Sequence, residues 1–301
     1  GTTSRGLGDV YKRQVKGTSM TSFPILSNKE KKELIQLANE AADCAREAIL
    51  PYFRKNIDVS NKDKEAFDPV TEADKAGEDA IRKVISFYRP DDGIWGEENG
   101  ESESNSGYRW VIDPIDGTRS FISGTPTWGV LISLEQIGNG PILGIIDQPY
   151  IKERFIGGFG TSEVQGPLGV RSLQVSATSS LSESKLFTTF PEVGTEKEKM
   201  GFSAVAREAK LVRYGLDCYA YALVAAGQVD LVIEASLNAY DIQAPISVIQ
   251  AAGGVVTSWS GKPAHLGGQV IAAANQKLHQ QALDILNPYS CLLYTSDAAD
   301  D

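Results

Sequence analysis

The chain has 301 residues, of which 42% are hydrophobic, and a formal net charge of −10 at pH 7. This length supports one large domain or two smaller ones with a packed core, and no apolar run reaches the roughly 18 residues of a membrane span. The negative charge argues against binding nucleic acid or an anionic membrane. Three cysteines without a C-x-x-C pair argue against a disulfide framework or a zinc ribbon and favour a reducing, cytoplasmic compartment.

The two ends of the sequence differ from its middle. Residues 1–19 lack the apolar segment of a secretory signal, and residues 289–301 follow a natural helix stop at Asn287-Pro288. We interpret both ends as non-native sequence or disordered tails. The folded domain is expected over residues 25–288.

The first two predicted elements are helices. Ser27 and Glu30 form a capping box, leucine and alanine follow at helical spacing, and Pro51 ends the helix. A second helix is expected after the motif DPVTEAD at residues 68–74. Its buried face is predicted to carry Ile81, Val84, Ile85 and Tyr88.

Strands dominate the next part of the sequence. Strands are expected at residues 109–113, 128–136, 141–148 and 152–158, with a hairpin turn at 138–140. After Gly166 the pattern alternates. We expect strands at 185–189, 210–213 and 229–234 and near Val255 and Val270, and helices at 195–209, 218–226, 241–252 and 276–286. A meander followed by this alternation predicts an α/β (α+β) fold of layered sheets and helices.

Acidic residues gather in four short segments at the edges of predicted elements. The segments are 68–74 (DPVTEAD), 95–98 (WGEE), 113–118 (DPIDGT) and 240–241 (YD). Oxygen ligands suit a hard cation such as Mg²⁺ rather than zinc. The two histidines, at positions 265 and 279, lie outside all four segments and are interpreted as structural or surface residues.

The DPIDGT segment joins two kinds of site. Asp113 and Asp116 are three residues apart across a turn that Pro114 stiffens, so both carboxylates can converge. Gly117 and Thr118 are expected to begin a helix, and a helix start offers free N–H groups to a phosphate. Metal-binding acids beside an anion-binding helix start suggest metal-assisted phosphoryl transfer to water.

In this order, the four motifs resemble those of the inositol monophosphatase family of Mg²⁺-dependent phosphatases, over about residues 25–288. The resemblance implies a layered α-β-α-β-α sandwich. It implies two main Mg²⁺ sites and a weaker third. Glu97, Asp113 and the Ile115 carbonyl would bind the first cation, and Asp113, Asp116 and Asp241 the second.

The resemblance also assigns catalytic roles. Asp74 and Thr118 would orient and deprotonate the attacking water beside Glu97, and the Gly117 and Thr118 N–H groups would meet the phosphate. Lys64 corresponds to a family lysine near the water, with Lys62 as the alternative. The implied mechanism is direct attack by water, without a covalent enzyme intermediate.

Plainer interpretations of three of these residues stay open. Asp241 precedes a predicted helix and would serve equally as its N-cap. Asp74 would interact favourably with a helix dipole in the first turn. Cys218 lacks the downstream arginine of a cysteine phosphatase, so we predict a buried small apolar residue.

The substrate is predicted from three further residues. Arg119 follows DGT, where it would help neutralise phosphate charge, and residues 213–244 resemble the histidinol-phosphatase branch of the family. Asp217 and Glu234 would favour an alcohol with an ammonium and an imidazole through charge-assisted hydrogen bonds. The alternative for Asp217 is an N-cap of the following helix.

The sequence therefore predicts a histidinol-phosphate phosphatase of histidine biosynthesis. The enzymatic alternative is an inositol-1-monophosphatase or a broad sugar-phosphate phosphatase. A non-enzymatic alternative is a regulator that binds transcription machinery, as some bacterial family members do. The resemblance further implies a homodimer that acts on a small phosphate ester, without nucleic acid or membrane partners.

Overall fold

The computed structural model describes residues 26–55, 59–61, 69–190 and 192–291. Lys64 and Lys62 lie outside the described residues, as do residues 1–19 and 292–301 of the two predicted tails. The helices are α1 (Asn28–Ile49), α2 (Glu72–Tyr88), α3 (Thr118–Ile122), α4 (Glu196–Glu208), α5 (Cys218–Ala225), α6 (Ala239–Ala251) and α7 (Gln276–Leu286), with short 3₁₀ turns at Leu50–Tyr52, Leu181–Glu183 and Asn287–Tyr289.

The larger sheet has eight strands in the order β10-β9-β8-β7-β6-β5-β3-β4. Its pairs are antiparallel except β3 with β5, so the predicted meander is confirmed. The sequence analysis did not predict β3, β4, β9 or β10. The strands are β3 (Gly93–Gly96), β4 (Gly100–Ser102), β5 (Tyr108–Asp116), β6 (Gly129–Gln136), β7 (Gly140–Gln148), β8 (Glu153–Gly158), β9 (Thr161–Gly166) and β10 (Gly169–Ser172).

The smaller sheet has five strands in the order β12-β11-β13-β15-β14. Strand β11 pairs in parallel with β12 and β13, whereas β15 pairs antiparallel with β13 and β14. A separate hairpin joins β1 to β2 just before α2. The strands are β1 (Val59–Asn61), β2 (Pro69–Thr71), β11 (Lys185–Thr188), β12 (Leu211–Tyr214), β13 (Leu231–Leu237), β14 (Val255–Thr257) and β15 (Gly268–Ala273).

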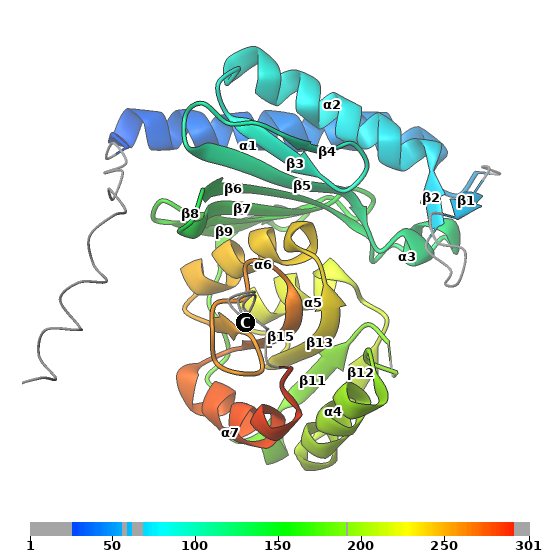
Figure 1. The fold of residues 1–301 in the computed structure, drawn as a ribbon, viewed down its shortest axis with the longest axis vertical. Helices are drawn as coiled ribbons and strands as arrows, with labels where there is room; N and C mark the ends of the chain where they lie inside the picture. Colours follow the sequence, from blue (N-terminus) through cyan, green and yellow to red (C-terminus); the bar gives the residue numbers. More distant parts are fainter. Residues whose placement is uncertain (1–25, 56–58, 62–68, 191, 292–301) are drawn as a thin grey trace, which may run out of the picture.

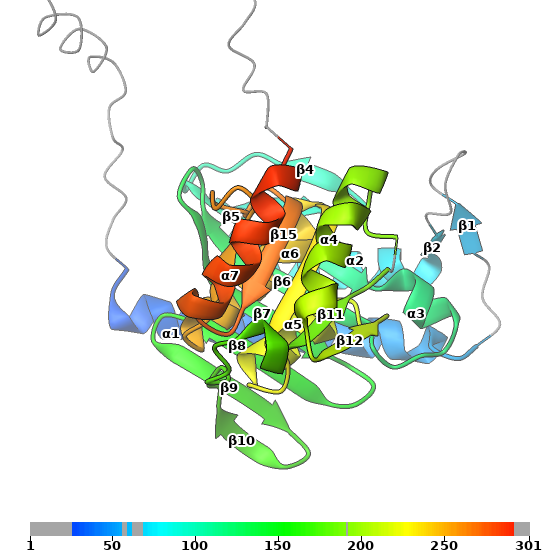
Figure 2. The ribbon, with the colours of Figure 1, turned by 90° about the horizontal axis from the view of Figure 1, so that it is seen from below.

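Helices and sheets alternate in five layers (Figure 1). Helices α1 and α2 cover the outer face of the eight-stranded sheet, and α5 and α6 lie between the two sheets. Helices α4 and α7 cover the far face of the five-stranded sheet, as the view from below also shows (Figure 2). The predicted α-β-α-β-α sandwich is thus confirmed.

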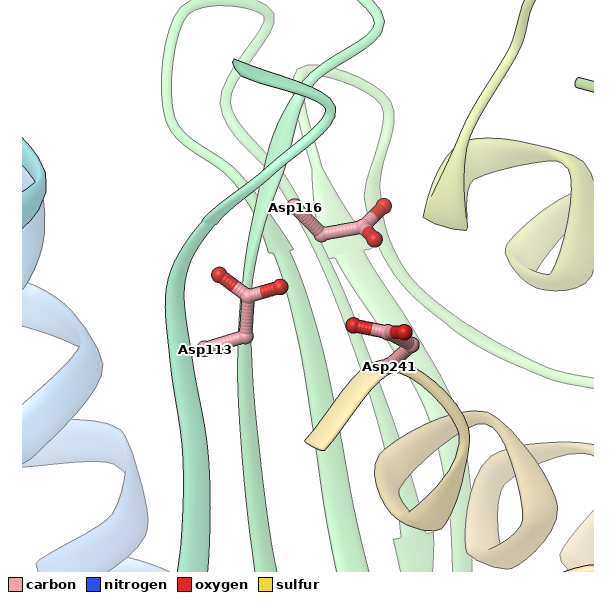
Figure 3. A group of neighbouring side chains, drawn as sticks. All are labelled: Asp113, Asp116 and Asp241. Atoms are coloured by element: carbon pink, nitrogen blue, oxygen red, sulfur yellow. The ribbon is translucent and has the colours of Figure 1, made fainter. Parts of the chain in front are cut away.

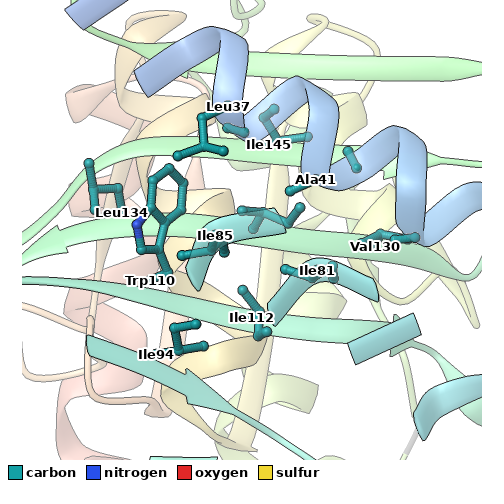
Figure 4. Packing of buried hydrophobic residues seen from close by; sticks show 14 of the residues in the cluster. Leu37, Ala41, Ile81, Ile85, Ile94, Trp110, Ile112, Val130, Leu134 and Ile145 are labelled. Atoms are coloured by element: carbon teal, nitrogen blue, oxygen red, sulfur yellow. The ribbon is translucent and has the colours of Figure 1, made fainter. Parts of the chain in front are cut away.

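The first of three cores lies between the α1–α2 pair and the large sheet (Figure 4). Trp110 and Ile112 of β5 are fully buried against Ile81 and Ile85 of α2. Tyr88 was predicted on the same helix face, but it is 54% exposed. Its hydroxyl lies 3.4 Å from Glu40 Oε1, so it contacts the surface of α1 rather than the sheet.

Two further cores complete the layers. One surrounds α5 and α6 between the sheets, and the other lies between the five-stranded sheet and helices α4 and α7. Within the described ranges, no helix combines the length and the hydrophobicity that crossing a bilayer requires. The folded part of the chain extends beyond residue 288, where the sequence analysis placed its end. The Cys291 N–H donates a hydrogen bond to Gln269 Oε1 at 2.8 Å.

Candidate active site

Strand β5 carries two of the predicted metal ligands at its end. The sequence analysis predicted a turn from Asp113 to Asp116, but the chain stays paired with β6. Asp113 lies opposite Leu131 and Asp116 opposite Gly129, so two residues of β5 face one residue of β6. This bulge breaks the two-residue alternation of side chains and turns both carboxylates toward one place. The prediction of a turn was wrong, whereas the predicted convergence is confirmed.

Asp241 reaches the same place from the first turn of α6. The N-cap of α6 is Asn238, and Asp241 is the third helical residue, whose Oδ2 accepts a hydrogen bond from the Asn238 N–H at 2.7 Å. The two residues form a capping box. The alternative that Asp241 is itself the N-cap is therefore wrong, although its carboxylate does satisfy a helix-end donor.

The three carboxylates meet between β5 and α6 (Figure 3). One oxygen each of Asp113, Asp116 and Asp241 lies within 4.8 Å of the others. Burial, followed by repulsion from Glu97 and from the other two aspartates, raises the pKa of Asp113 well above its usual range. Burial raises the pKa of Asp241 to about 7, and Glu97 and Glu234 add repulsion. Bringing acids together in this way is unfavourable unless a cation neutralises them.

The donor set fits a hard divalent cation. Every acidic group in the cluster offers oxygen, and neither histidine lies near it. Glu97 follows β3, its N–H donates to the Ile112 carbonyl at 3.3 Å, and it lines the same cavity as the three aspartates. The Ile115 carbonyl, the remaining predicted ligand, accepts a hydrogen bond from Thr118 Oγ1 at 3.2 Å.

A cavity of about 610 Å³ opens over this cluster. Gly117, Thr118 and Arg119 line it beside the acids. Gly117 has a φ of +86°, and a Cβ there would lie 2.6 Å from Asp217 Cγ, so both backbone conformation and space require glycine. The predicted helix after DPIDG is the short α3, whose first residues face the cavity.

Comparison with known proteins decides what this arrangement is. The model of the inositol monophosphatase family matches residues 30–289. The chain belongs to the inositol monophosphatase family. It is 42% identical over 272 residues to the Bifunctional phosphatase IMPL2, chloroplastic, of Arabidopsis thaliana, covering 87% of this chain and 77% of that relative. It is 37% identical over 252 residues to a Histidinol-phosphatase of Chlorobaculum parvum, covering 81% and 93%.

A solved structure agrees with this assignment. An inositol monophosphatase from Zymomonas mobilis superimposes with a TM-score of 0.76 at 34% identity, covering 87% of this chain and 99% of that one. The predicted family is thus confirmed, and with it a metal-dependent phosphatase function. The relatives differ in the substrate that their names state.

Asp74 of this phosphatase lies at the first turn of α2 and is 1% exposed. Its Oδ2 accepts hydrogen bonds from the Thr71 N–H at 2.8 Å and from Thr71 Oγ1 at 2.7 Å, which completes a capping box. The Oδ2 atom of Asp74 thus has a structural role as an acceptor at the start of α2. Its catalytic role stays a prediction, because Asp74 is not among the residues that line the cavity.

Asp217 connects two elements of the cavity wall, the start of α5 and the short helix α3. It is the N-cap residue of α5, as the alternative predicted, with a φ of +48°, but its side chain forms no capping hydrogen bond with that helix. Its Oδ2 instead accepts a hydrogen bond from Ser120 Oγ of α3 at 2.6 Å. The N–H at the start of α5, that of Cys218, donates to Asp116 Oδ2. The start of α5 is thereby tied to Asp116, a predicted metal ligand.

Glu234 forms the wall of the cavity farther along β13 and is 6% exposed. Its Oε1 accepts hydrogen bonds from the Thr189 N–H, at 2.9 Å, and from Thr189 Oγ1. Its Oε2 accepts one from the Tyr221 hydroxyl at 2.8 Å. Burial raises the pKa of Glu234, while these hydrogen bonds lower it.

Three residues that the sequence analysis missed thus support the site: Thr189, Tyr221 and Asn238. The one available signal is that Tyr221 follows Asp217, the residue before α5, by four residues, which is about one helical turn. Two minor predictions are confirmed. Cys218 is buried, and His279 is buried with its Nε2 2.8 Å from Thr257 Oγ1, a structural role.

Proposed function

We propose that this phosphatase is a Mg²⁺-dependent phosphomonoester hydrolase that converts L-histidinol phosphate and water to L-histidinol and phosphate. The observation that supports the substrate most is Glu234, a buried carboxylate on the cavity wall. An ammonium group would offset the cost of burying this charge, whereas a neutral hydroxyl would not. The 37% identical Histidinol-phosphatase is consistent with this choice.

Five residues would hold the cations: Glu97, Asp113, Asp116 and Asp241 through carboxylates and Ile115 through its carbonyl. When bound, Mg²⁺ neutralises these acids, polarises the phosphoryl oxygens and lowers the pKa of a coordinated water. The number of cations stays a prediction, with two main sites and a weaker third.

The chain itself would position the ester. The left-handed backbone at Gly117 turns the start of α3 toward the cavity, so the N–H groups of Gly117 and Thr118 can bind phosphoryl oxygens. Arg119 adds a positive charge on the same side. Thr118 Oγ1 and Asp74 would orient the attacking water. Groups that the fold already holds in position would stabilise the developing charge, so no covalent enzyme intermediate is needed.

The alcohol half would lie toward Glu234. Thr189 and Tyr221 fix the carboxylate from two sides, which limits its rotation before substrate arrives. Oε1 already accepts two hydrogen bonds from Thr189, whereas Oε2 accepts one from Tyr221 and keeps a second acceptor site, where an ammonium donor can still be bound. Asp217 already accepts a hydrogen bond from Ser120, so we expect it to contribute negative charge near the alcohol more than a direct hydrogen bond.

An inositol-1-monophosphatase is the second candidate, because the inositol monophosphatase from Zymomonas mobilis is 34% identical. The regulatory alternative is less favoured, since the four acids predicted to bind the metal line one cavity. A homodimer in the cytoplasm, without nucleic acid or membrane partners, stays a prediction that size-exclusion chromatography and fractionation can check.

The test compares phosphate release from histidinol phosphate and inositol 1-phosphate, with Mg²⁺ and with chelator. We expect Mg²⁺-dependent preference for histidinol phosphate, and Glu234→Gln should reduce turnover of that ester more than of inositol phosphate. Glu153→Gln is the matched control, because Glu153 Oε2 also accepts a tyrosine hydroxyl, that of Tyr219 at 2.7 Å, away from the cavity. Equal losses on both esters would remove Glu234 from the specificity argument. Turnover that survives chelation would refute the metal site.

A further inference from the structure

A stacked pair of side chains lies at the outer end of the cavity. The Arg119 guanidinium carbon is 4.8 Å from the centroid of the Phe190 ring, and both residues line the cavity. Both are exposed, whereas Asp113 and Glu234 are buried. Phe190 is 45% exposed, so its ring retains surface that a ligand can cover.

The segment that carries Phe190 is anchored to the wall where the alcohol would lie. The preceding residue, Thr189, donates two hydrogen bonds to Glu234 Oε1. After the ring, Val193 has a φ of +41°, a conformation that β-branched residues rarely adopt. Such strain persists where the surroundings determine the backbone, and it concentrates at functional sites. The position of the ring is therefore set by the chain around it.

Arg119 shares the cavity lining with Asp217. Burial raises the pKa of Asp217, and the positive charge of Arg119 partly opposes that effect. Asp217 accepts a hydrogen bond from Ser120 of the same helix as Arg119, α3. The guanidinium that stacks on Phe190 therefore lies in a part of the cavity where the acidic side chain is held in place.

We propose that Phe190, with Arg119, forms a stacking wall that selects phosphate esters whose alcohol carries a planar ring. Aromatic faces and guanidinium planes both attract flat π systems. A puckered polyol ring has no such face and gains only apolar contact. The inference deepens the proposed function, since histidinol carries an imidazole and inositol does not.

The test uses two esters of equal size, benzyl phosphate and cyclohexylmethyl phosphate. Both are esters of primary alcohols, so they differ chiefly in whether the ring is flat. We expect the wild-type protein to prefer the benzyl ester, by kcat/KM or by competitive inhibition. Phe190→Leu should reduce that preference about three- to tenfold, the range typical of one aromatic contact, mainly through KM.

Two further variants complete the design. Phe190→Tyr keeps the aromatic face and should keep the preference, which a merely structural role of the side chain would not require. Phe87→Leu changes a phenylalanine that is 77% exposed on α2, outside the cavity, and should leave the preference unchanged. An unaltered preference in Phe190→Leu, or no preference in the wild-type protein, would overturn the stacking wall.

The stacking wall and the proposed function can fail separately. If inositol phosphate is the better natural ester but Phe190→Leu still reduces the benzyl preference, the proposed function fails and the wall stands. If histidinol phosphate is preferred and Phe190→Leu has no effect on the benzyl preference, the wall fails and the proposed function stands.

Discussion

Asp241→Asn should stabilise the metal-free protein at neutral pH while removing its response to Mg²⁺. The folded protein raises the pKa of Asp241 to about 7 from an ordinary 3.8. Below pH 3.8 the carboxyl is protonated in both the folded and the unfolded chain, and the raised pKa costs nothing. As pH rises toward 7, the unfolded chain ionises first, so stability is lost. Above pH 7 the loss is complete.

The magnitude follows from the difference in pKa. A shift of about three units corresponds to on the order of 4 kcal/mol, or roughly 10 °C in melting temperature for a domain of this size. Asparagine is isosteric, and its Oδ1 can still accept the Asn238 N–H, so the capping box survives. The variant should therefore melt higher than the wild-type protein in chelator at pH 8, with the difference vanishing near pH 4.

The assay is a series of thermal melts from pH 4 to pH 8, in chelator and in Mg²⁺. Added Mg²⁺ should raise the melting temperature of the wild-type protein at pH 8 and have little effect on the variant. Asp284→Asn, an exposed aspartate on α7, is the control and should follow the wild-type protein throughout. A pH-independent difference between Asp241→Asn and the wild-type protein would refute the reasoning, because titration of Asp241 would then not be its source.

Two other substitutions test the phosphate end of the cavity. Asp113→Asn should reduce Mg²⁺-dependent turnover by more than about 100-fold, since Asp113 is predicted to bind both main cations. Asp79→Asn, at an exposed aspartate on α2, is the control and should keep the turnover of the wild-type protein. Comparable turnover in the two variants would contradict the predicted role of Asp113. Gly117→Ala should lower kcat/KM at least about tenfold, because its Cβ would lie 2.6 Å from Asp217 Cγ. Gly100→Ala has a similar backbone, with φ +68°, but open space around it, so equal kinetic losses in both would argue against a role for the clash.

Local signals in the sequence were sufficient for much of the fold. The capping box at Ser27 and the helical spacing after it fixed α1, and the hairpin turn at residues 138–140 fixed the pairing of β6 with β7. Short edge strands such as β4 and β10 were missed because three or four residues carry too little periodicity. Tyr88 was wrongly predicted to be buried, because helical spacing identifies one face of α2 but does not indicate where the sheet beneath that face ends.

The candidate site likewise contains features that the sequence predicts and features that it does not. Asp113, Asp116 and Asp241 were predicted to converge because oxygen-rich motifs in order are informative. The hydrogen bonds from Thr189 and Tyr221 to Glu234 could not be predicted, since they join segments that meet only in the folded chain. The side-chain direction of Asp217 depends on a positive φ at this residue, which no neighbouring residue in the sequence indicates.

Two of the acids assigned to the reaction, Asp74 and Asp241, are also the third residues of capping boxes at the starts of α2 and α6. A single carboxylate in each case would then serve both the predicted reaction and the beginning of a helix. Random substitution at either position would usually remove a helix-end acceptor as well as a group predicted to act in the reaction. At Asp241 the relief of charge repulsion offsets this loss, whereas at Asp74 the lost cap is expected to lower stability. Inactive variants at Asp74 would therefore tend to be less stable as well, which narrows the mutational routes by which such a chain could lose its chemistry and persist as an inert scaffold.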